Sequence, residues 1–244
     1  MANCSCPDLR LLLTCEHAVN AVPPQYWYLF AGHETVLRTH RGYDQYALAV
    51  AKELARAFVA PLHAATVTRL LVDANRTPAS RTLFSSYARP LGRKERELVR
   101  ATWHTPHQEA VSDTAARIIV QGGRVLHIAI HTFTPVLHGQ VRTADLGLLY
   151  DPGRPEERAL CTRWLAELRR AAPDLRLRRN YPYLGKSNSL PTLLRTRFPG
   201  HDYLGIEVEI NQGTAVALGL DVIGGALIAS LDRVLPGLIP YDEK

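Results

Sequence analysis

The chain has 244 residues, of which 46% are hydrophobic, 21% are charged and 7% are aromatic. This balance excludes a disordered or fibrous chain, and the length is sufficient for one well-buried domain. The formal net charge of +6 permits anion or nucleic-acid binding without establishing it, because basic surfaces also serve solubility.

The cysteines and the N-terminal residues indicate a cytoplasmic protein. The four cysteines lack the paired spacing of a zinc ribbon or a secreted disulfide framework; they are Cys4, Cys6, Cys15 and Cys161. Residues 1–10 contain no apolar signal segment, and no uninterrupted apolar stretch reaches the ~18 residues that a membrane span requires. We therefore expect a cytoplasmic location and no membrane partner, and the sequence leaves the oligomeric state open.

Apolar runs of strand length alternate with stretches of helical periodicity. In chain order, the predicted strands are 11–14, 62–72, 125–130, 146–150, 175–177 and 203–210, and the predicted helices are 43–59, 92–120, 155–171, 190–197 and 216–235. This alternation predicts an α/β fold, a three-layer α/β/α sandwich with a mixed, mostly parallel sheet. Because no repeat or linker divides the chain, we expect a single domain over residues 1–244.

Polar residues follow three of the predicted strands. Glu16 and His17 follow the first strand, Asp73–Arg76 follow the second, and His131 follows the third. Ligands of open α/β sheets bind outside the carboxyl ends of strands, where the loops leave the sheet. The sequence therefore predicts that these residues share a site.

Two strands also carry polar residues inside their apolar runs. His127 lies within the third strand, and we expect a buried, hydrogen-bonded histidine there rather than a ligand. Glu207 and Glu209 share one face of the last predicted strand by period-2 alternation. Two acids buried there without partners would be costly, so a purely structural explanation does not account for both.

The residue types at these strand ends favour a metallohydrolase. Zinc in a catalytic site takes three protein ligands and keeps one position for water, and two histidines with a carboxylate supply such a set. The guanidinium of Arg76 has the fixed geometry that binds a carboxylate with two hydrogen bonds, although the nearby Asp73 could be its partner instead.

Seven segments, in chain order, resemble the N-formylglutamate amidohydrolase family, which is similar in fold to the zinc carboxypeptidase and aspartoacylase superfamily. They are EHAVNAVP (16–23), HRGYD (40–44), RLLVDANR (69–76), HTFTP (131–135), ADLGLLYDP (144–152), NYPYLG (180–185) and GIEVEINQ (205–212). The resemblance thus covers most of the chain.

The resemblance implies one zinc ion, or a related divalent metal, bound by His17, His131 and a carboxylate. Asp44 matches the aspartate that recurs in the family after the first loop, and Glu16 is the alternative third ligand. The wider superfamily places a glutamate three residues after the first histidine, but this chain has Asn20 there.

The resemblance also implies roles in catalysis and substrate binding. Glu209 matches the catalytic glutamate of the superfamily, and Glu207 would be a neighbour that orients a ligand. Arg69 would approach the oxyanion of the transition state. Asn75 and Arg76 match a segment that binds the carboxylate of the substrate.

The segment 180–198 has the composition of a loop over a pocket, from which Tyr183 and Arg195 would contact substrate; a plain connecting loop is the alternative. Family members that resemble authentic formylglutamate hydrolases have Arg-Gln-Asp after the catalytic glutamate and one further residue, whereas this chain has Asn211-Gln212-Gly213. This difference leaves the acyl group and the amino acid open.

We therefore expect a zinc-dependent amidohydrolase that cleaves a small N-acyl amino acid such as N-formylglutamate. A carboxypeptidase-like activity or another N-acyl amino acid deacylase is the alternative among enzymes. The alternative from another class is a metal-free α/β protein that binds anions or nucleic acid through Arg76 and the basic helices. On the favoured interpretation the partner is a small molecule, and no nucleic acid is expected.

Overall fold

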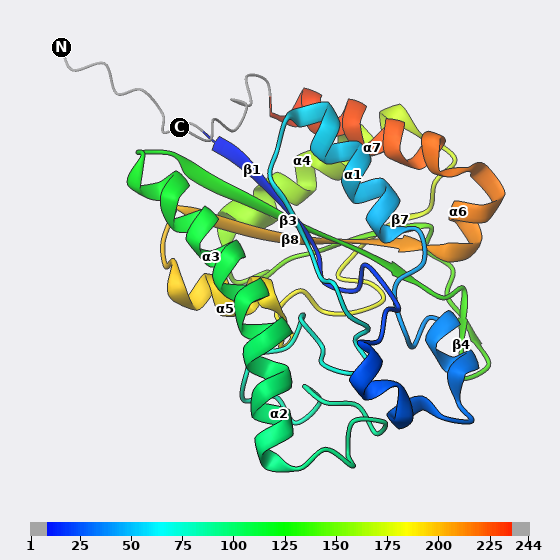
Figure 1. The fold of residues 1–244 in the computed structure, drawn as a ribbon. Coiled ribbons are helices and arrows are strands. Elements are labelled where there is room, and N and C mark those ends of the chain that lie inside the picture. The colour runs from blue at the N-terminus through cyan, green and yellow to red at the C-terminus, as the bar shows by residue number, and fades with distance from the viewer. Residues whose placement is uncertain (1–8, 236–244) are drawn as a thin grey trace.

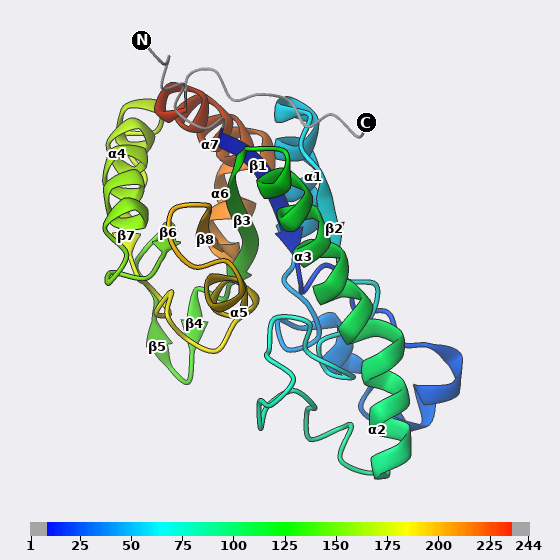
Figure 2. The same ribbon diagram turned by 90° about the vertical axis from the view of Figure 1, so that its left-hand side faces the viewer.

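The computed structural model describes residues 9–235, and these residues form three layers. A six-stranded sheet lies between helices on both of its faces (Figures 1 and 2). The predicted α/β class, with a mixed and mostly parallel sheet, is confirmed.

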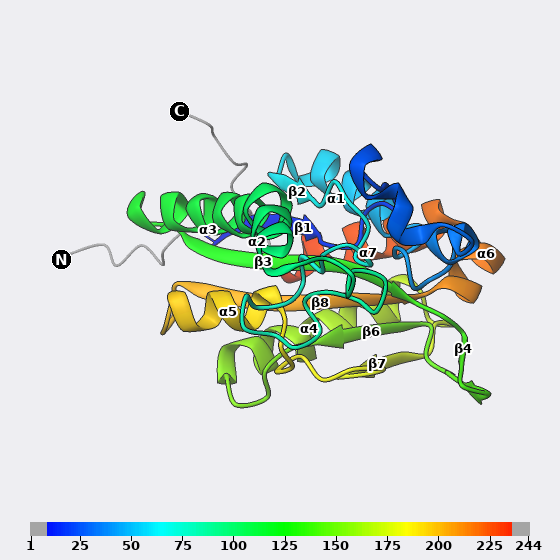
Figure 3. The same ribbon diagram turned by 60° about the horizontal axis from the view of Figure 1, so that its bottom comes forward.

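The sheet places strands from both halves of the chain side by side. Its strands are β1 (Leu9–Cys15), β2 (Leu62–Ala64), β3 (Arg124–Phe133), β6 (Leu146–Leu149), β7 (Leu177–Arg179) and β8 (Tyr203–Asn211). Their order is β2-β1-β3-β8-β6-β7 (Figure 3). β1 is parallel to β2 and β3, and β3 is parallel to β8, whereas β6 is antiparallel to β8 and parallel to β7. The carboxyl ends of β1, β3 and β8 therefore lie at one edge of the sheet.

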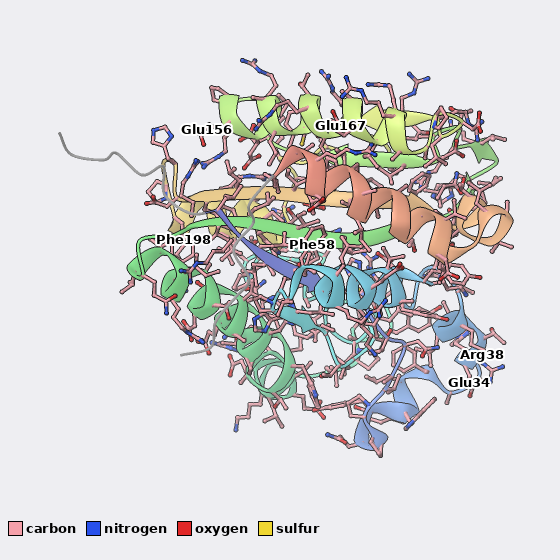
Figure 4. All side chains as sticks on the ribbon, turned by 90° about the horizontal axis from the view of Figure 1, so that it is seen from above. Glu34, Arg38, Phe58, Glu156, Glu167 and Phe198 are labelled. Atoms are coloured by element: carbon pink, nitrogen blue, oxygen red, sulfur yellow. The ribbon has the colours of Figure 1, made fainter. Side chains whose placement is uncertain are left out.

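Helices cover both faces of the sheet because its central strands are apolar on both sides. On one face lie α1 (Ala47–Phe58), α4 (Pro155–Ala171) and α7 (Leu220–Val234), with α7 between the other two (Figure 4). On the other face lie α3 (Thr105–Val120) and α5 (Leu190–Arg197). Leu13 belongs to the core under α1, and the next residue back, Leu12, belongs to the core under α3, as strand alternation requires.

A second apolar cluster lies outside these layers, and it overturns one predicted strand. The expected strand over 62–72 ends at Ala64, and residues 65–76 form a segment of turns, bends and irregular backbone, called the turn segment below. Their apolar side chains are nevertheless buried, because Leu71 and its neighbours pack with Phe30 and Val99 in this cluster. The apolar run was thus correctly predicted as buried but wrongly predicted as a strand.

The helices that surround the second cluster are short. They are two 3-10 helices, Pro24–Phe30 and Glu34–Arg38, and the helix α2 (Arg93–Val99). A small antiparallel hairpin of β4 (Val136–Leu137) and β5 (Gln140–Val141) also stands apart from the main sheet.

The helices differ from their predicted bounds where the backbone leaves the regular path. α1 begins at Ala47 rather than at 43, because Tyr46 has a positive φ of 73°. The predicted helix 92–120 comprises α2, a π-helical turn at Arg100–His104 and α3. The predicted helix 216–235 comprises α6 (Gln212–Leu218) and α7, which meet at Gly219 with a bend of 103°.

Within residues 9–235, no single helix is long and apolar enough to cross a membrane, and the bent α6–α7 pair meets that test only when its two helices are counted together. Cys15 and Cys161 are free and buried. Cys4 and Cys6 lie outside the described residues.

Candidate active site

The carboxyl ends of the neighbouring strands β1, β3 and β8 bring distant polar residues together. Glu16 and His17 follow β1 directly, and His131 lies near the end of β3. Glu209 is the register partner of His131 on β8 (Figure 1 shows β3 and β8 side by side). All four side chains are buried.

His17, Asp44 and His131, the three expected metal ligands, converge on one point. One donor atom from each lies within 4.8 Å of the other two. The Oδ2 atom of Asp44 is 3.2 Å from the Nδ1 atom of His17 and 2.9 Å from the Nδ1 atom of His131. Asp44 reaches this point from the turn before α1, where its backbone N–H donates to the carbonyl of His17. The group could therefore hold a metal ion.

The far nitrogen of each imidazole faces a second carboxylate. The Nε2 atom of His17 is 2.7 Å from the Oδ1 atom of Asp73, and the Nε2 atom of His131 is 3.1 Å from the Oε2 atom of Glu16. A carboxylate beside the far nitrogen is a common orienting partner of a metal-ligating histidine. The contact of His17 with Asp73 is a hydrogen bond, whereas Glu16 is an ion-pair contact of His131, whose Nε2 atom has its hydrogen bond with the side-chain amide of Asn75 at 3.3 Å. Glu16 thus lies across His131 from Asp44, in the place of an orienting group rather than that of the alternative ligand.

The charges of this cluster are strongly coupled. Burial alone would raise the pKa of Asp44, but the charge and hydrogen bonds of the two imidazoles hold that pKa well below its usual value. Burial would likewise raise the pKa of Glu16, and the contact with His131 instead lowers it to about 2. Burial disfavours the charged form of His131, yet Asp44 and Glu16 raise its pKa well above the usual value.

The residues present fit a divalent cation. Two imidazole nitrogens and one carboxylate oxygen are the donor set of many catalytic zinc sites. In addition, both oxygens of Glu16, one of Glu207 and one of Glu209 are buried without a hydrogen-bond partner among residues 9–235. So many buried acids are expensive unless positive charge compensates them.

Glu209 differs from the acids that contact the histidines. Burial raises its pKa to about 8, the negative charges of Asp44 and Glu207 add to the rise, and the nearby His131 and Arg69 oppose it. A carboxylate with such a pKa binds a proton more strongly than an exposed glutamate does, which suits proton transfer near neutral pH.

A cavity of about 630 Å³ opens onto this cluster. It is lined by both histidines, Asp44, Glu207 and Glu209, and by four residues expected to act on substrate, namely Arg69, Asn75, Arg76 and Tyr183. The remaining lining comes mainly from the end of β3, the β4–β5 hairpin and the loop before α5. The size suits a small molecule such as an N-acyl amino acid.

Arg69 is held in place by two of the site's acids. Its Nη2 atom donates to the Oδ2 atom of Asp73 at 3.1 Å, and its Nη1 atom lies 3.5 Å from the Oδ1 atom of Asp44. Burial disfavours the charged form, but these two aspartates raise the pKa of the guanidinium. Arg69 thus presents a fixed positive charge at the cavity.

Asn75 and Arg76 lie on the turn segment rather than after a strand, which corrects their predicted setting. The Asx turn in which the backbone N–H of Asn75 donates to Asp73 orders this segment. Asn75 also accepts a hydrogen bond from the backbone of Leu190, and Arg76 donates to the carbonyl of Asn188. These bonds tie the loop before α5 to one side of the cavity.

Arg195 was wrongly predicted to contact substrate. It is buried outside the cavity, where its Nε atom donates to Glu157 at 2.9 Å. Its remaining donors bind the carbonyls of Gly185 and Gly205. Because these bonds occupy the guanidinium donors, Arg195 links α5 to β8 and to the loop that precedes α5.

His127 is confirmed as a buried, hydrogen-bonded histidine. Its Nε2 atom is 2.7 Å from the hydroxyl of Thr14, and its Nδ1 atom is 2.6 Å from the hydroxyl of Tyr203. Burial lowers its pKa to about 4, so it is neutral at pH 7.

Sequence reasoning missed three residues of the site. Asp73 was considered only as a partner of Arg76, and its contact with His17 depends on a turn that the apolar pattern concealed. His40 and Arg142 also line the cavity, and His40 could have been found because it begins the HRGYD segment (40–44). Arg142 lies between the HTFTP and ADLGLLYDP segments, in a stretch that neither segment includes.

Comparisons with known proteins agree with this architecture. A sequence search finds no match among curated proteins. The crystal structure of gene product Atu2144 from Agrobacterium tumefaciens superposes with a TM-score of 0.76 at 28% identity, covering 93% of this chain and 92% of that one. The N-formylglutamate amidohydrolase from Ralstonia eutropha JMP134 superposes with a TM-score of 0.68 at 18% identity, covering 94% and 93% respectively, which shows a shared fold.

The family comparison covers most of the chain. The model of the N-formylglutamate amidohydrolase family matches residues 9–215, a range that contains every residue of the cluster described above. The family acts on amide bonds by hydrolysis. The chain belongs to the N-formylglutamate amidohydrolase family.

Proposed function

We propose that this protein is a zinc-dependent amidohydrolase that cleaves a small N-acyl amino acid, with N-formylglutamate as the leading substrate. The observation that carries the proposal is the convergence of His17, Asp44 and His131 at a cavity that Glu209 also lines. Family membership supports the hydrolysis of an amide bond.

In this proposal His17 and His131 would hold the ion with ring nitrogens, and Asp44 would hold it with a carboxylate oxygen. Asp73 and Glu16 fix the orientation of the two imidazoles from the far side. A bound zinc ion supplies a Lewis acid that polarises a carbonyl and makes a water molecule more acidic.

Glu209 moves the proton in the reaction. It takes a proton from the attacking water as the new C–O bond forms, and it passes that proton to the amine nitrogen as the C–N bond breaks. The products are a carboxylic acid and a free amino acid, so water supplies all the added atoms. The raised pKa of Glu209 supports this role, because burial makes its carboxylate a stronger base than that of an exposed glutamate.

The arginines act on substrate charge. Arg69, fixed by Asp44 and Asp73, faces the negative charge that develops on the carbonyl oxygen in the transition state. Asn75 and Arg76 bind the carboxylate of the amino acid, and Tyr183, which also lines the cavity, contacts the substrate.

A panel of substrates, combined with metal analysis, tests the proposal. Release of free amino acid is measured for N-formylglutamate, other N-formyl and N-acetyl amino acids and short peptides, before and after chelation and after zinc is restored. We expect N-formylglutamate to be cleaved fastest, chelation to abolish cleavage and zinc to restore it.

The other outcomes of this panel separate the alternatives. Faster cleavage of another acyl group or of a peptide would indicate the related deacylase or a carboxypeptidase-like activity instead. Unchanged hydrolysis after complete removal of the metal would contradict zinc dependence. No hydrolysis, together with anion binding that falls steeply with salt and survives His17→Ala, would favour the metal-free binding protein.

A further inference from the structure

We propose that Arg142 forms a second anion-binding subsite in the cavity, which selects substrates that carry a negatively charged side chain in addition to the carboxylate bound near Arg76. This inference rests on the proposed function, and it adds to it the residue that recognises the amino-acid side chain.

Arg142 lies on a different segment of the cavity wall from the other two arginines. It lines the cavity on the side formed by the β4–β5 hairpin, whereas Arg69 and Arg76 line it from the turn segment 65–76. His17, Asp44 and His131 line the same cavity. A substrate bound at the metal cluster would therefore find positive charge on two separate segments of the wall.

Arg142 differs from the other two arginines in its charged neighbours. Among residues 9–235, the guanidinium of Arg142 forms no ion pair. By contrast, Arg69 is paired with Asp44 and Asp73, and the Nε atom of Arg76 lies 3.9 Å from Asp73. A half-buried guanidinium without an acidic neighbour is suited to bind a negatively charged group of a ligand.

Two aromatic rings hold the side chain of Arg142 in position and leave most of its donors unused. Its side chain packs against the rings of Phe133 and Tyr183, with 5.7 Å and 5.2 Å between the guanidinium carbon and the two ring centroids. Its Nη1 atom donates to the hydroxyl of Tyr183 at 3.2 Å, which is the one side-chain hydrogen bond given by this guanidinium among the described residues. The rest of the fork is free to bind a carboxylate.

The backbone around Arg142 is also anchored. Its N–H donates to the carbonyl of Pro135 at 2.7 Å, and its carbonyl accepts from the side chain of Asn211 at 3.2 Å. The hairpin turns at His138 and Gly139, both with positive φ, as a tight two-residue turn requires. Asn211 is the residue that ends β8 two positions after Glu209, so the subsite is tied to the strand that carries the proposed base.

The ligand that fits is an N-acyl amino acid with a second carboxylate at the end of its side chain. One carboxylate would lie at Asn75 and Arg76, and the other would lie at Arg142. The amide bond would then lie at the metal cluster. A phosphate group on the side chain would offer the same charge, and the test below includes it as a probe.

The test compares two substrates that differ only in that charge, N-formyl-L-glutamate and N-formyl-L-glutamine. We expect the wild-type protein to favour the glutamate by at least about tenfold in kcat/KM, since a hydrogen bond to a charged group contributes about that factor. Arg142→Gln should lower kcat/KM for the glutamate by about 10- to 100-fold, mainly through KM, and change the value for the glutamine by less than about threefold.

Two further variants control for charge and folding. Arg142→Lys keeps the charge but not the planar fork, so it should restore part of the preference. Arg163→Gln removes an equal charge from an exposed position on α4 and should leave both substrates unaffected. An equal loss for both substrates in Arg142→Gln, or an unchanged ratio, would overturn the subsite.

A binding measurement separates this inference from the proposed function. Glutarate, which carries two carboxylates and no amide, is titrated into the wild-type and Arg142→Gln proteins, with inorganic phosphate as a second probe. Tighter binding of glutarate to the wild type by about tenfold or more supports the subsite even if no N-formyl amino acid is cleaved, and equal binding overturns it. If the wild type binds phosphate more tightly than glutarate, and Arg142→Gln loses this phosphate binding, the favoured ligand of the subsite is a phosphate and the carboxylate is overturned.

Discussion

The cavity has two sides that are built differently. On the metal side, His17, His131 and Glu209 stand at the ends of strands in the middle of the sheet, and each is at most 5% exposed. Elsewhere on the cavity wall, Tyr183 lies on a loop and is 45% exposed, and Arg142 follows a short hairpin. The groups proposed to break the bond are therefore fixed by the core, whereas those proposed to recognise the substrate lie on segments that can differ without disturbing the sheet.

This difference gives an order of expected effects. Changes on the metal side should abolish the reaction, changes to the carboxylates behind the histidines should weaken metal binding, and changes outside the cavity should affect stability alone.

The largest effect is expected on removal of a proposed ligand. His131→Ala should lower kcat/KM by about 10³-fold or more, because the ion that polarises the substrate is lost. The same variant should contain little zinc by elemental analysis and keep a native circular dichroism spectrum. His201→Ala, which removes an exposed imidazole outside the cavity, is the matched control. Full activity of His131→Ala would contradict the claim that the metal side of the cavity breaks the bond.

The next effect concerns Glu209 and its neighbour two residues earlier. Glu209→Gln should lower kcat by about 10²- to 10⁴-fold while the zinc content stays at the wild-type value, because the proton transfer is lost and the ligands are intact. Glu207→Gln is the paired control and should reduce kcat less, since Glu207 is proposed only to orient a neighbour. Steady-state kinetics on both variants checks the ranking, and the reverse order would assign the base to Glu207.

A smaller effect is expected behind the histidines. Asp73→Asn should weaken zinc binding by about 10- to 100-fold, because His17 loses the charged partner that fixes its orientation. Glu16→Gln should act in the same way through His131. Competition with a chelator of known affinity measures both, and unchanged zinc affinity in both variants would show that the carboxylates serve only packing.

The sequence allowed much of the metal side to be predicted, for a physical reason. Apolar strands reveal where they end, and the carboxyl ends of parallel strands meet at one edge, so Glu16-His17, His131 and Glu209 could be placed together. The buried role of His127 followed from the same periodicity. The family resemblance then suggested Asp44, which no periodicity marks.

The rest of the site depends on contacts that leave no local pattern. The run 62–72 is as apolar as a strand, yet most of it packs as turns in a second core, so the contact between Asp73 and His17 could not be foreseen. Arg195 has the appearance of a substrate-binding residue in the sequence, but Glu157, 38 residues away, binds it. Arg142 was missed because its neighbours Phe133 and Tyr183 come from separate segments.

The smallest effect should arise outside the cavity, at the ion pair of Asp145 and Arg176. Hydrogen bonds from Arg176 lower the pKa of Asp145 to about 2, against the opposing effect of burial. Since the folded-state pKa lies below the unfolded value, this contribution is present at neutral pH and is lost as the pH falls from about 5 to about 2.

Asp145→Asn should therefore lower the free energy of unfolding by about 1 to 2 kcal/mol at pH 7 and by less at pH 3. Urea unfolding at the two pH values measures the difference, and activity at pH 7 should remain close to the wild-type value. A loss of stability that is equal at both pH values would show that the charge of Asp145 does not contribute.

The central claim is that His17, Asp44 and His131 hold one catalytic metal ion, and zinc titration of the metal-free protein tests it most directly. We expect one zinc ion to bind per chain in the wild type, with hydrolysis returning in proportion to occupancy, and no tight binding in the His17→Ala/His131→Ala double variant. Wild-type protein that binds no zinc, or a double variant that binds it equally well, would contradict the account.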